Sequence, residues 1–221
     1  MQSPIIWEVK NYDYNTAGQI SRRLSISPLC AGLLVQRGVK TPEEARYFLH
    51  ADLKDLQDPF NLTGIEPATD RIKQAIAAGE KIVIYGDYDV DGVCSIVILK
   101  QCLEMLGGTV DYYVPERFNE GYGLNMQAVE HLAGSGYSLL ITVDCGITSV
   151  AEVERAVNLG MDVIISDHHT PPGQLPPTRV IINPKLGSTP ELADLCGAGV
   201  VFKLCQALCP EYAIDKQSSW L

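Results

Sequence analysis

The sequence predicts an α/β fold: a mostly parallel, Rossmann-like sheet with flanking helices, preceded by a small helical lead-in. From Lys81 onward, short apolar runs rich in Val and Ile alternate with helical stretches. These runs are apolar throughout, which is typical of parallel strands buried on both faces. The 221 residues are 46% hydrophobic and 20% charged, so the composition is that of an ordinary globular protein.

The first 78 residues form the expected helical lead-in. Residues 41–44 read Thr-Pro-Glu-Glu, which places an N-cap, a first-turn proline and two acids at the positive end of a helix dipole. The apolar stripe of this helix is expected at Ala45, Phe48 and Leu49. A second helix is expected over residues 67–78, where Gly79 ends it.

The second predicted domain spans residues 79–221 and holds the sheet. We expect its strands at residues 82–85, 110–114, 139–143, 162–166 and 180–182. We expect helices at residues 92–106, 124–133, 149–159 and 198–208. Strands that alternate with helices in this way form parallel sheets through crossover connections.

Two features of the composition limit the location of the protein. No apolar run approaches the ~18 residues that a membrane span needs, and residues 1–10 lack the pattern of a signal peptide. We therefore expect a cytoplasmic protein without a membrane partner. The seven scattered cysteines do not fit a disulfide framework, and Cys205 and Cys209 are expected to be buried thiols rather than zinc ligands.

The formal net charge of −10 is unusual for a protein that binds nucleic acid through a basic surface. Two interpretations stay open from composition alone. Either the chain binds no polyanion, or its acids are concentrated in a metal site while basic binding surfaces lie elsewhere.

Acidic and histidine residues follow three of the predicted strands. Residues 86–92 read Gly-Asp-Tyr-Asp-Val-Asp-Gly, residues 143–146 read Val-Asp-Cys-Gly, and residues 166–169 read Ser-Asp-His-His. Because the carboxyl ends of parallel strands meet at one edge, these side chains are expected to share a crevice. Any one cluster alone is equally typical of a turn or a helix cap.

Carboxylates that gather in one crevice repel each other unless cations neutralise them. A mixed Asp and His set suits Mn²⁺, or Mg²⁺ with more water, and two ions ~4 Å apart form a hydrolytic centre. The candidate residues are Asp87, Asp89, Asp91, Asp144, Asp167, His168 and His169.

These strings resemble the three motifs of the DHH phosphoesterases. Residues 84–92 are similar to motif I, residues 143–147 to motif II, and residues 167–169 to the motif that names the family. Three further strings resemble its branch of RecJ-type exonucleases: residues 114–124 (VPERFNEGYGL), 182–184 (INP) and 196–200 (CGAGV). The long helical lead-in is also similar to that branch.

The resemblance implies a metal-dependent hydrolase with two divalent ions, Mn²⁺ or Mg²⁺. It implies a 5′-to-3′ exonuclease on single-stranded DNA in repair and recombination. A single-strand-binding protein or a helicase would then be a partner. Asp89, Asp91, Asp144 and His168 would be metal ligands, with Asp144 bridging the ions and Asp87 bound directly or through water.

The remaining candidates would act on the substrate or on the ligands. His169 would contact the scissile phosphate or assist proton transfer to the leaving oxygen, and Asp167 would orient a histidine. Arg117 is a candidate phosphate contact, the alternative being a solvated loop arginine. Tyr122 is a candidate for stacking on a base, the alternative being packing.

Part of the family pattern is not found in these 221 residues. A fourth metal-binding aspartate, the DHHA1 region and the oligonucleotide-binding region are missing, so we expect a fragment that is weak or inactive alone. The alternative functions are a DHH phosphodiesterase of short RNA or cyclic dinucleotides, a manganese pyrophosphatase, and a non-catalytic DHH replication scaffold. The full set of motif carboxylates argues against the scaffold, and the absence of a histidine shortly before the paired aspartates argues against the pyrophosphatase.

Overall fold

The computed structural model describes residues 10–116 and 123–210. The chain divides into two compact units between Leu56 and Gln57. Each unit buries its own apolar core. None of the helices in the described ranges is both long and apolar enough to cross a membrane.

The first unit consists of three short helices: α1 (Tyr14–Leu24), α2 (Pro28–Gln36) and α3 (Pro42–Leu49). The predicted cap of α3 is confirmed, because the Thr41 side chain accepts a hydrogen bond from the amide of Glu44 at 3.1 Å. The expected apolar stripe is wrong in part. Ala45 is buried, whereas Phe48 and Leu49, in the last turn of this short helix, are 58% and 41% exposed.

The second unit contains a five-stranded sheet in the order β2-β1-β3-β4-β5, in which every pair is parallel. This confirms the predicted fold class. The strands are β1 (Lys81–Gly86), β2 (Thr109–Tyr113), β3 (Leu139–Val143), β4 (Asp162–Ser166) and β5 (Val180–Ile182). Each predicted strand is therefore present within one residue of its expected bounds.

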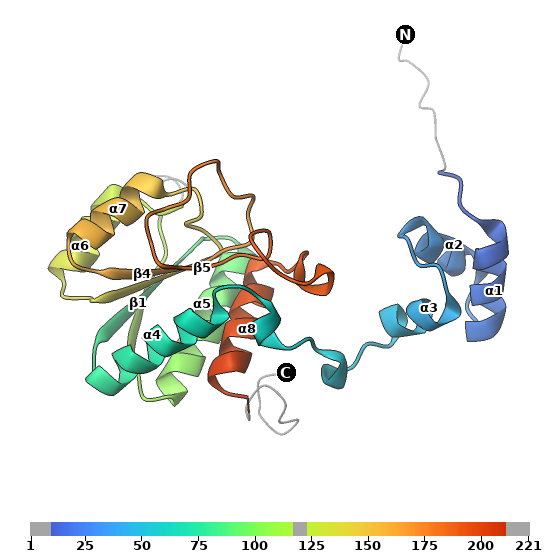
Figure 1. The fold of residues 1–221 in the computed structure, drawn as a ribbon, viewed down its shortest axis with the longest axis horizontal. Helices are drawn as coiled ribbons and strands as arrows, with labels where there is room; N and C mark the ends of the chain where they lie inside the picture. Colours follow the sequence, from blue (N-terminus) through green and yellow to red (C-terminus); the bar gives the residue numbers. More distant parts are fainter. Residues whose placement is uncertain (1–9, 117–122, 211–221) are drawn as a thin grey trace, which may run out of the picture. The chain divides into compact units, whose positions relative to one another are not determined.

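Helices cover both faces of the sheet (Figure 1). One face packs against α4 (Ile65–Ala78), α5 (Val90–Met105) and α8 (Gly197–Leu208). The other packs against α6 (Met126–Gly134) and α7 (Val150–Asn158). Neighbouring strand residues divide between these cores: Ile84 faces the first and Tyr85 the second. Burial on both sides explains why the strands read as unbroken apolar runs.

The boundary between the units lies earlier than the boundary expected from sequence. We assigned residues 67–78 to the lead-in, but α4 belongs to the second unit and buries Ile65, Ala68 and Ile72 in the core of the sheet. The buried Lys203 of α8 also reaches back to the carbonyl of Gln57. A helix that precedes the first strand can cover a sheet face, and composition alone does not distinguish it from a linker helix.

The segment before α4 approaches the sheet closely at Gly64. Its φ is +93°, and a Cβ added there would lie 2.2 Å from the carbonyl oxygen of Ile181 in β5. Gly79, which caps the other end of α4, also has a positive φ of +66°, but an added Cβ would meet nothing within 4 Å. A side chain added at Gly79 would therefore meet backbone strain only, whereas one added at Gly64 would meet both backbone strain and a steric clash.

We expect Gly79→Ala to cost about 1–2 kcal/mol, the penalty for a left-handed non-glycine residue. Gly64→Ala should cost about 1–3 kcal/mol more, because the methyl group must displace the β5 backbone. Urea unfolding followed by circular dichroism measures both changes in the free energy of unfolding. Equal decreases in the free energy of unfolding for the two variants would show that the β5 backbone shifts without an energetic cost.

Candidate metal centre

Three adjacent strands of the sheet deliver the candidate ligands to one edge. Asp87 follows β1, Asp144 follows β3, and residues 167–169 follow β4. Asp87, Asp144 and Asp167 are all at most 3% exposed. Buried carboxylates at the carboxyl ends of neighbouring strands confirm the predicted convergence, although their positions span about 80 residues of sequence.

Asp144 lies at the centre of this edge. One carboxylate oxygen of Asp144 and one each from Asp87 and Asp89 lie within 4.8 Å of one another. A second group, with the same spacing, joins Asp144 to His168 and His169. Each group could hold one cation. Because Asp144 belongs to both, it is the residue able to bridge two ions.

The backbone of Asp144 is strained. Its φ is +58°, in the left-handed region that non-glycine residues rarely adopt, and its amide donates to the carbonyl of Ser166 on β4 at 2.9 Å. Such strain costs about 1–3 kcal/mol and is typical of functional sites. Gly146, with φ +105°, completes this turn.

The carboxylate of Asp144 fits a cation. Its Oδ1 atom is buried without a hydrogen-bond partner among the residues that the structure describes. The Nε2 atom of His168 is 3.1 Å from this oxygen, but the two form no hydrogen bond, as expected when both face a common ion. Burial, together with the charges of Asp91 and Asp89, raises the pKa of Asp144 from its ordinary value to about 7.

His168 is suited to bind metal in its neutral form. Burial and the neighbouring His169 lower its pKa. A neutral imidazole keeps a ring nitrogen lone pair for coordination. The donor set of carboxylates and imidazole suits Mn²⁺, and Mg²⁺ with additional water. The residues present therefore fit two divalent cations.

Asp91 has a different environment from the other candidate ligands. Its two carboxylate oxygens accept hydrogen bonds from the amides of Gly197 and Ala198, both at 2.7 Å, at the start of α8. It lies 3.7 Å from Nε2 of His168 and belongs to neither ligand group. A carboxylate oxygen has more than one acceptor site, so capping α8 leaves Asp91 able to coordinate as well. Asp89 also has a second task, since it caps α5 through the amide of Gly92.

Asp167 organises the paired histidines. Its Oδ1 accepts from the amides of His168 and His169 and lies 2.7 Å from Nδ1 of His169. Its Oδ2 accepts from the amide of Ile147 in the loop after β3. This carboxylate therefore fixes the ring of His169 rather than that of His168, and directs Nε2 of His169 away from itself.

Two residues support the site that the sequence motifs did not assign. Asn183 is fully buried and donates from Nδ2 to the carbonyl of His169 at 3.0 Å. Gly197 allows α8 to approach Asp144, because an added Cβ would lie 2.5 Å from Oδ1 of that residue. Both occur in strings that resembled the family, but nothing local in those strings reveals the contact. Arg117 and Tyr122 lie outside the described residues.

The fold and the site define a Rossmann-like α/β protein with a ligand set for two cations at the carboxyl edge of its sheet. Residues 81–219 match the model of the DHH family, N-terminal domain. Because this match covers more than half of the sequence, the chain belongs to the DHH family.

Individual relatives support the same placement. The chain is 48% identical over 212 residues to the single-stranded-DNA-specific exonuclease RecJ of Bacillus subtilis (strain 168), which covers 96% of this chain and 27% of that protein. It thus spans about a quarter of the length of this relative.

Solved structures of relatives agree. A crystal structure of exonuclease RecJ bound to manganese is 40% identical, with a TM-score of 0.60, over 68% of this chain and 38% of the other. RecJ from Thermus thermophilus in complex with Mn²⁺ is 30% identical, with a TM-score of 0.70, over 91% of this chain and 28% of the other.

The raised pKa of Asp144 predicts how pH affects the stability of the metal-free protein. The folded state holds this proton up to about pH 7, whereas an unfolded aspartate loses it near pH ~4. Folding therefore takes up a proton in this window, so stability should fall as pH rises from about 4 to about 7. Thermal unfolding with chelator should show this slope in the wild type and a shallower one in Asp144→Asn. Equal slopes of stability against pH in the two proteins would contradict the assignment of the raised pKa to Asp144.

Gly197→Ala tests whether α8 shapes the metal centre. The added methyl group would collide with the carboxylate of Asp144, so we expect Mn²⁺ affinity to fall about 10- to 100-fold, as for other supporting residues of metal sites. Titration calorimetry with Mn²⁺ measures this. Gly134→Ala is the matched control, because an added Cβ at the end of α6 meets nothing within 4 Å. Unchanged affinity in Gly197→Ala would place the ions away from Asp144.

Proposed function

We propose that the protein containing these 221 residues hydrolyses the phosphodiester bonds of single-stranded DNA, as a 5′-to-3′ exonuclease that uses two divalent metal ions, Mn²⁺ or Mg²⁺. The observation that carries this proposal is the sharing of buried Asp144 by two ligand groups. The names of the relatives, single-stranded-DNA-specific exonuclease and RecJ bound to manganese, support the substrate and the metal. Because the chain spans only part of these relatives, the activity is proposed for the whole protein.

The proposed ligands divide between the two groups. Asp87, Asp89 and Asp144 would hold one ion, and Asp144 with His168 the other, with Asp91 close enough to join the second. When bound, the ions would activate a water molecule for attack on phosphorus and neutralise the charge that develops on the phosphate oxygens.

His169 is proposed to act on the substrate. Its Nδ1 is held by the buried carboxylate of Asp167, and a histidine held in this way can donate or accept a proton at Nε2. We assign to it contact with the scissile phosphate and proton transfer to the leaving oxygen. Asp167 would be a positioning residue, because it touches the ring of His169 rather than the reacting atoms.

The cellular role follows from the substrate. Degradation of single strands from a 5′ end serves DNA repair and recombination, and it would take place in the cytoplasm. A single-strand-binding protein or a helicase that supplies such strands would be the partner. The names of the relatives favour this role over hydrolysis of short RNA or cyclic dinucleotides.

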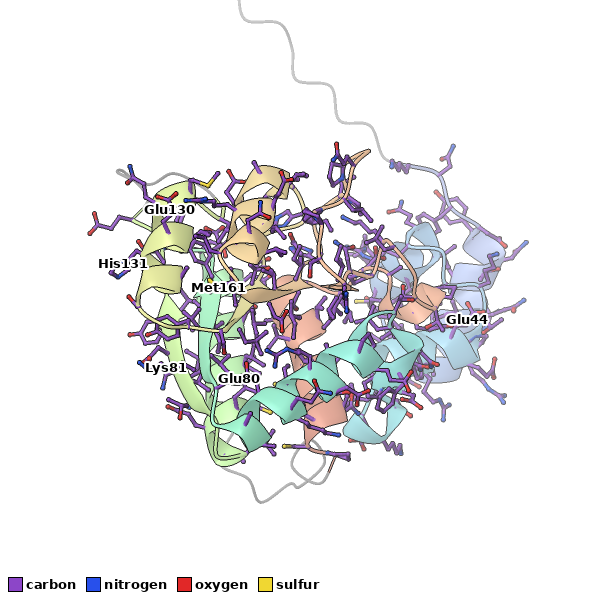
Figure 2. All side chains as sticks on the ribbon, turned by 60° about the vertical axis from the view of Figure 1, so that its left-hand side comes forward. Glu44, Glu80, Lys81, Glu130, His131 and Met161 are labelled. Carbon is purple, nitrogen blue, oxygen red and sulfur yellow. The ribbon has the colours of Figure 1, made fainter. Side chains whose placement is uncertain are left out.

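A pair of variants separates metal binding from proton transfer. Asp144→Asn should abolish hydrolysis and reduce the number of bound Mn²⁺ ions, because it removes the charge shared by both groups. His169→Gln should keep both ions but lower kcat by about 10²- to 10⁴-fold, the range for a general acid. His131→Gln, a substitution of an exposed histidine on α6 (Figure 2), is the control and should change neither.

The assay uses the full-length protein with single-stranded DNA labelled at either end, and metal content is measured on every variant. Immediate release of a 5′ label as a small product, with stepwise shortening of the 3′-labelled strand, is the expected result. The reverse pattern would contradict the polarity. Loss of metal from His169→Gln would make His169 a ligand, and full activity of Asp144→Asn would overturn the two-metal site.

A further inference from the structure

The metal centre lies at an edge of the sheet that is poor in positive charge, although the proposed substrate is a polyanion. Asp87, Asp89, Asp91, Asp144 and Asp167 all belong to this edge. Two divalent ions would neutralise much of this charge, but the protein has a net charge of −10. A cationic side chain next to the ions would therefore have a large effect on the approach and seating of DNA.

Most basic residues of the second unit in the described ranges lie elsewhere. Arg71 binds Glu80 and Asp162 at the amino edge of the sheet. Lys81 is the first residue of β1, and Arg179 immediately precedes β5, so both also lie at the amino edge. Figure 2 labels Lys81 beside Glu80 at the start of β1.

Other basic residues of this unit lie on the helices, where they are paired with an acid, buried or away from the carboxyl edge of the sheet. Lys100 pairs with Glu104 within α5, and Arg155 of α7 pairs with Glu130 of α6. Lys203 is buried in α8, and Lys73 is exposed beyond the middle of α4. Among the described residues of this unit, Lys185 alone remains as a cation that follows a strand at the carboxyl edge.

The backbone of Lys185 is tied directly to the histidine motif. Its amide donates to Oδ1 of Asn183 at 2.9 Å, and Nδ2 of the same buried asparagine donates to the carbonyl of His169 at 3.0 Å. The Lys185 side chain is exposed. Because β5 pairs with β4, the turn that carries Lys185 lies beside the segment that carries the histidine motif, at the same edge of the sheet.

The loop that carries Lys185 is held on its other side as well. The Ser188 hydroxyl donates to the carbonyl of Pro184 at 2.8 Å, and Ser188 forms a β-bridge with Leu62. The amide of Thr63 donates to the carbonyl of Gly187 at 3.0 Å. A turn fixed at both sides presents Lys185 at a constant position, so little backbone order is lost when its side chain meets an anion.

We propose that Lys185 is a substrate-binding residue whose ammonium group contacts a non-bridging phosphate oxygen of the DNA strand at the metal centre. The proposal rests on the proposed function and adds to it a residue outside the three motifs. Lysine carries a positive charge with three donors on a flexible stem, which suits a phosphate whose orientation is set by the metal ions.

The test compares Lys185→Gln, Lys185→Arg and Lys81→Gln in the full-length protein with a single-stranded oligothymidylate substrate. Lys185→Gln should raise KM about 3- to 10-fold with little change in kcat, the pattern of lost uniform binding. It should reduce the slope of log affinity against log salt by about 0.7, the value for one phosphate contact on a single strand. Lys185→Arg should restore most of the affinity. Lys81→Gln removes the same charge at the opposite edge and should match the wild type.

Mn²⁺ binding to each variant distinguishes the possible failures. Normal Mn²⁺ affinity in Lys185→Gln is expected, and a loss of it would overturn the proposal by showing a structural role. A KM and salt slope equal to those of Lys81→Gln would also overturn it. A fall in kcat with an unchanged KM in Lys185→Gln would exclude a binding role. Asp144→Asn is assayed in parallel. If Asp144→Asn is inactive while Lys185→Gln behaves as the wild type, only the role of Lys185 is rejected. If Asp144→Asn is fully active, the proposed function is rejected.

Discussion

The mutual repulsion of carboxylates at the carboxyl edge of the sheet is the constraint on which the rest of this structure depends. Three adjacent parallel strands bring the buried side chains of Asp87, Asp144 and Asp167 to one place. Asp167 is stabilised by amides and by a histidine ring. Asp144 has no such compensation at Oδ1 within the part of the chain that the structure describes, so its charge must be balanced by a cation or removed by a proton. A bound cation would stabilise the charged form of Asp144, which the metal-free fold disfavours.

The surroundings of Asp144 are costly for stability and are consistent with metal binding. Its left-handed backbone and its buried carboxylate each oppose folding of the metal-free chain. The apolar cores on the two faces of the sheet supply the stabilisation that offsets these costs. Candidate ligands held in this way would need little rearrangement on binding ions.

Most of the fold followed from periodicity, because unbroken apolar runs such as residues 139–143 identify strands buried on both faces. The convergence of the three motifs followed from topology, since parallel strands end at a common edge. Periodicity did not reveal that α4 covers the sheet, nor that Phe48 would be exposed. The contacts of Asn183 with His169 and of Gly197 with Asp91 are long-range, so no pattern within their own segments could predict them. The individual roles of the site residues remain predictions.

The two hydrogen bonds from the start of α8 to Asp91 join residues that are 106 and 107 positions apart. During synthesis on the ribosome, the motif I loop emerges long before the helix that caps it. The surroundings of Asp91 and Asp144 are therefore incomplete until α8 has been made and has docked beside α5. The two hydrogen bonds to Asp91 cannot form before the chain has been made as far as Ala198.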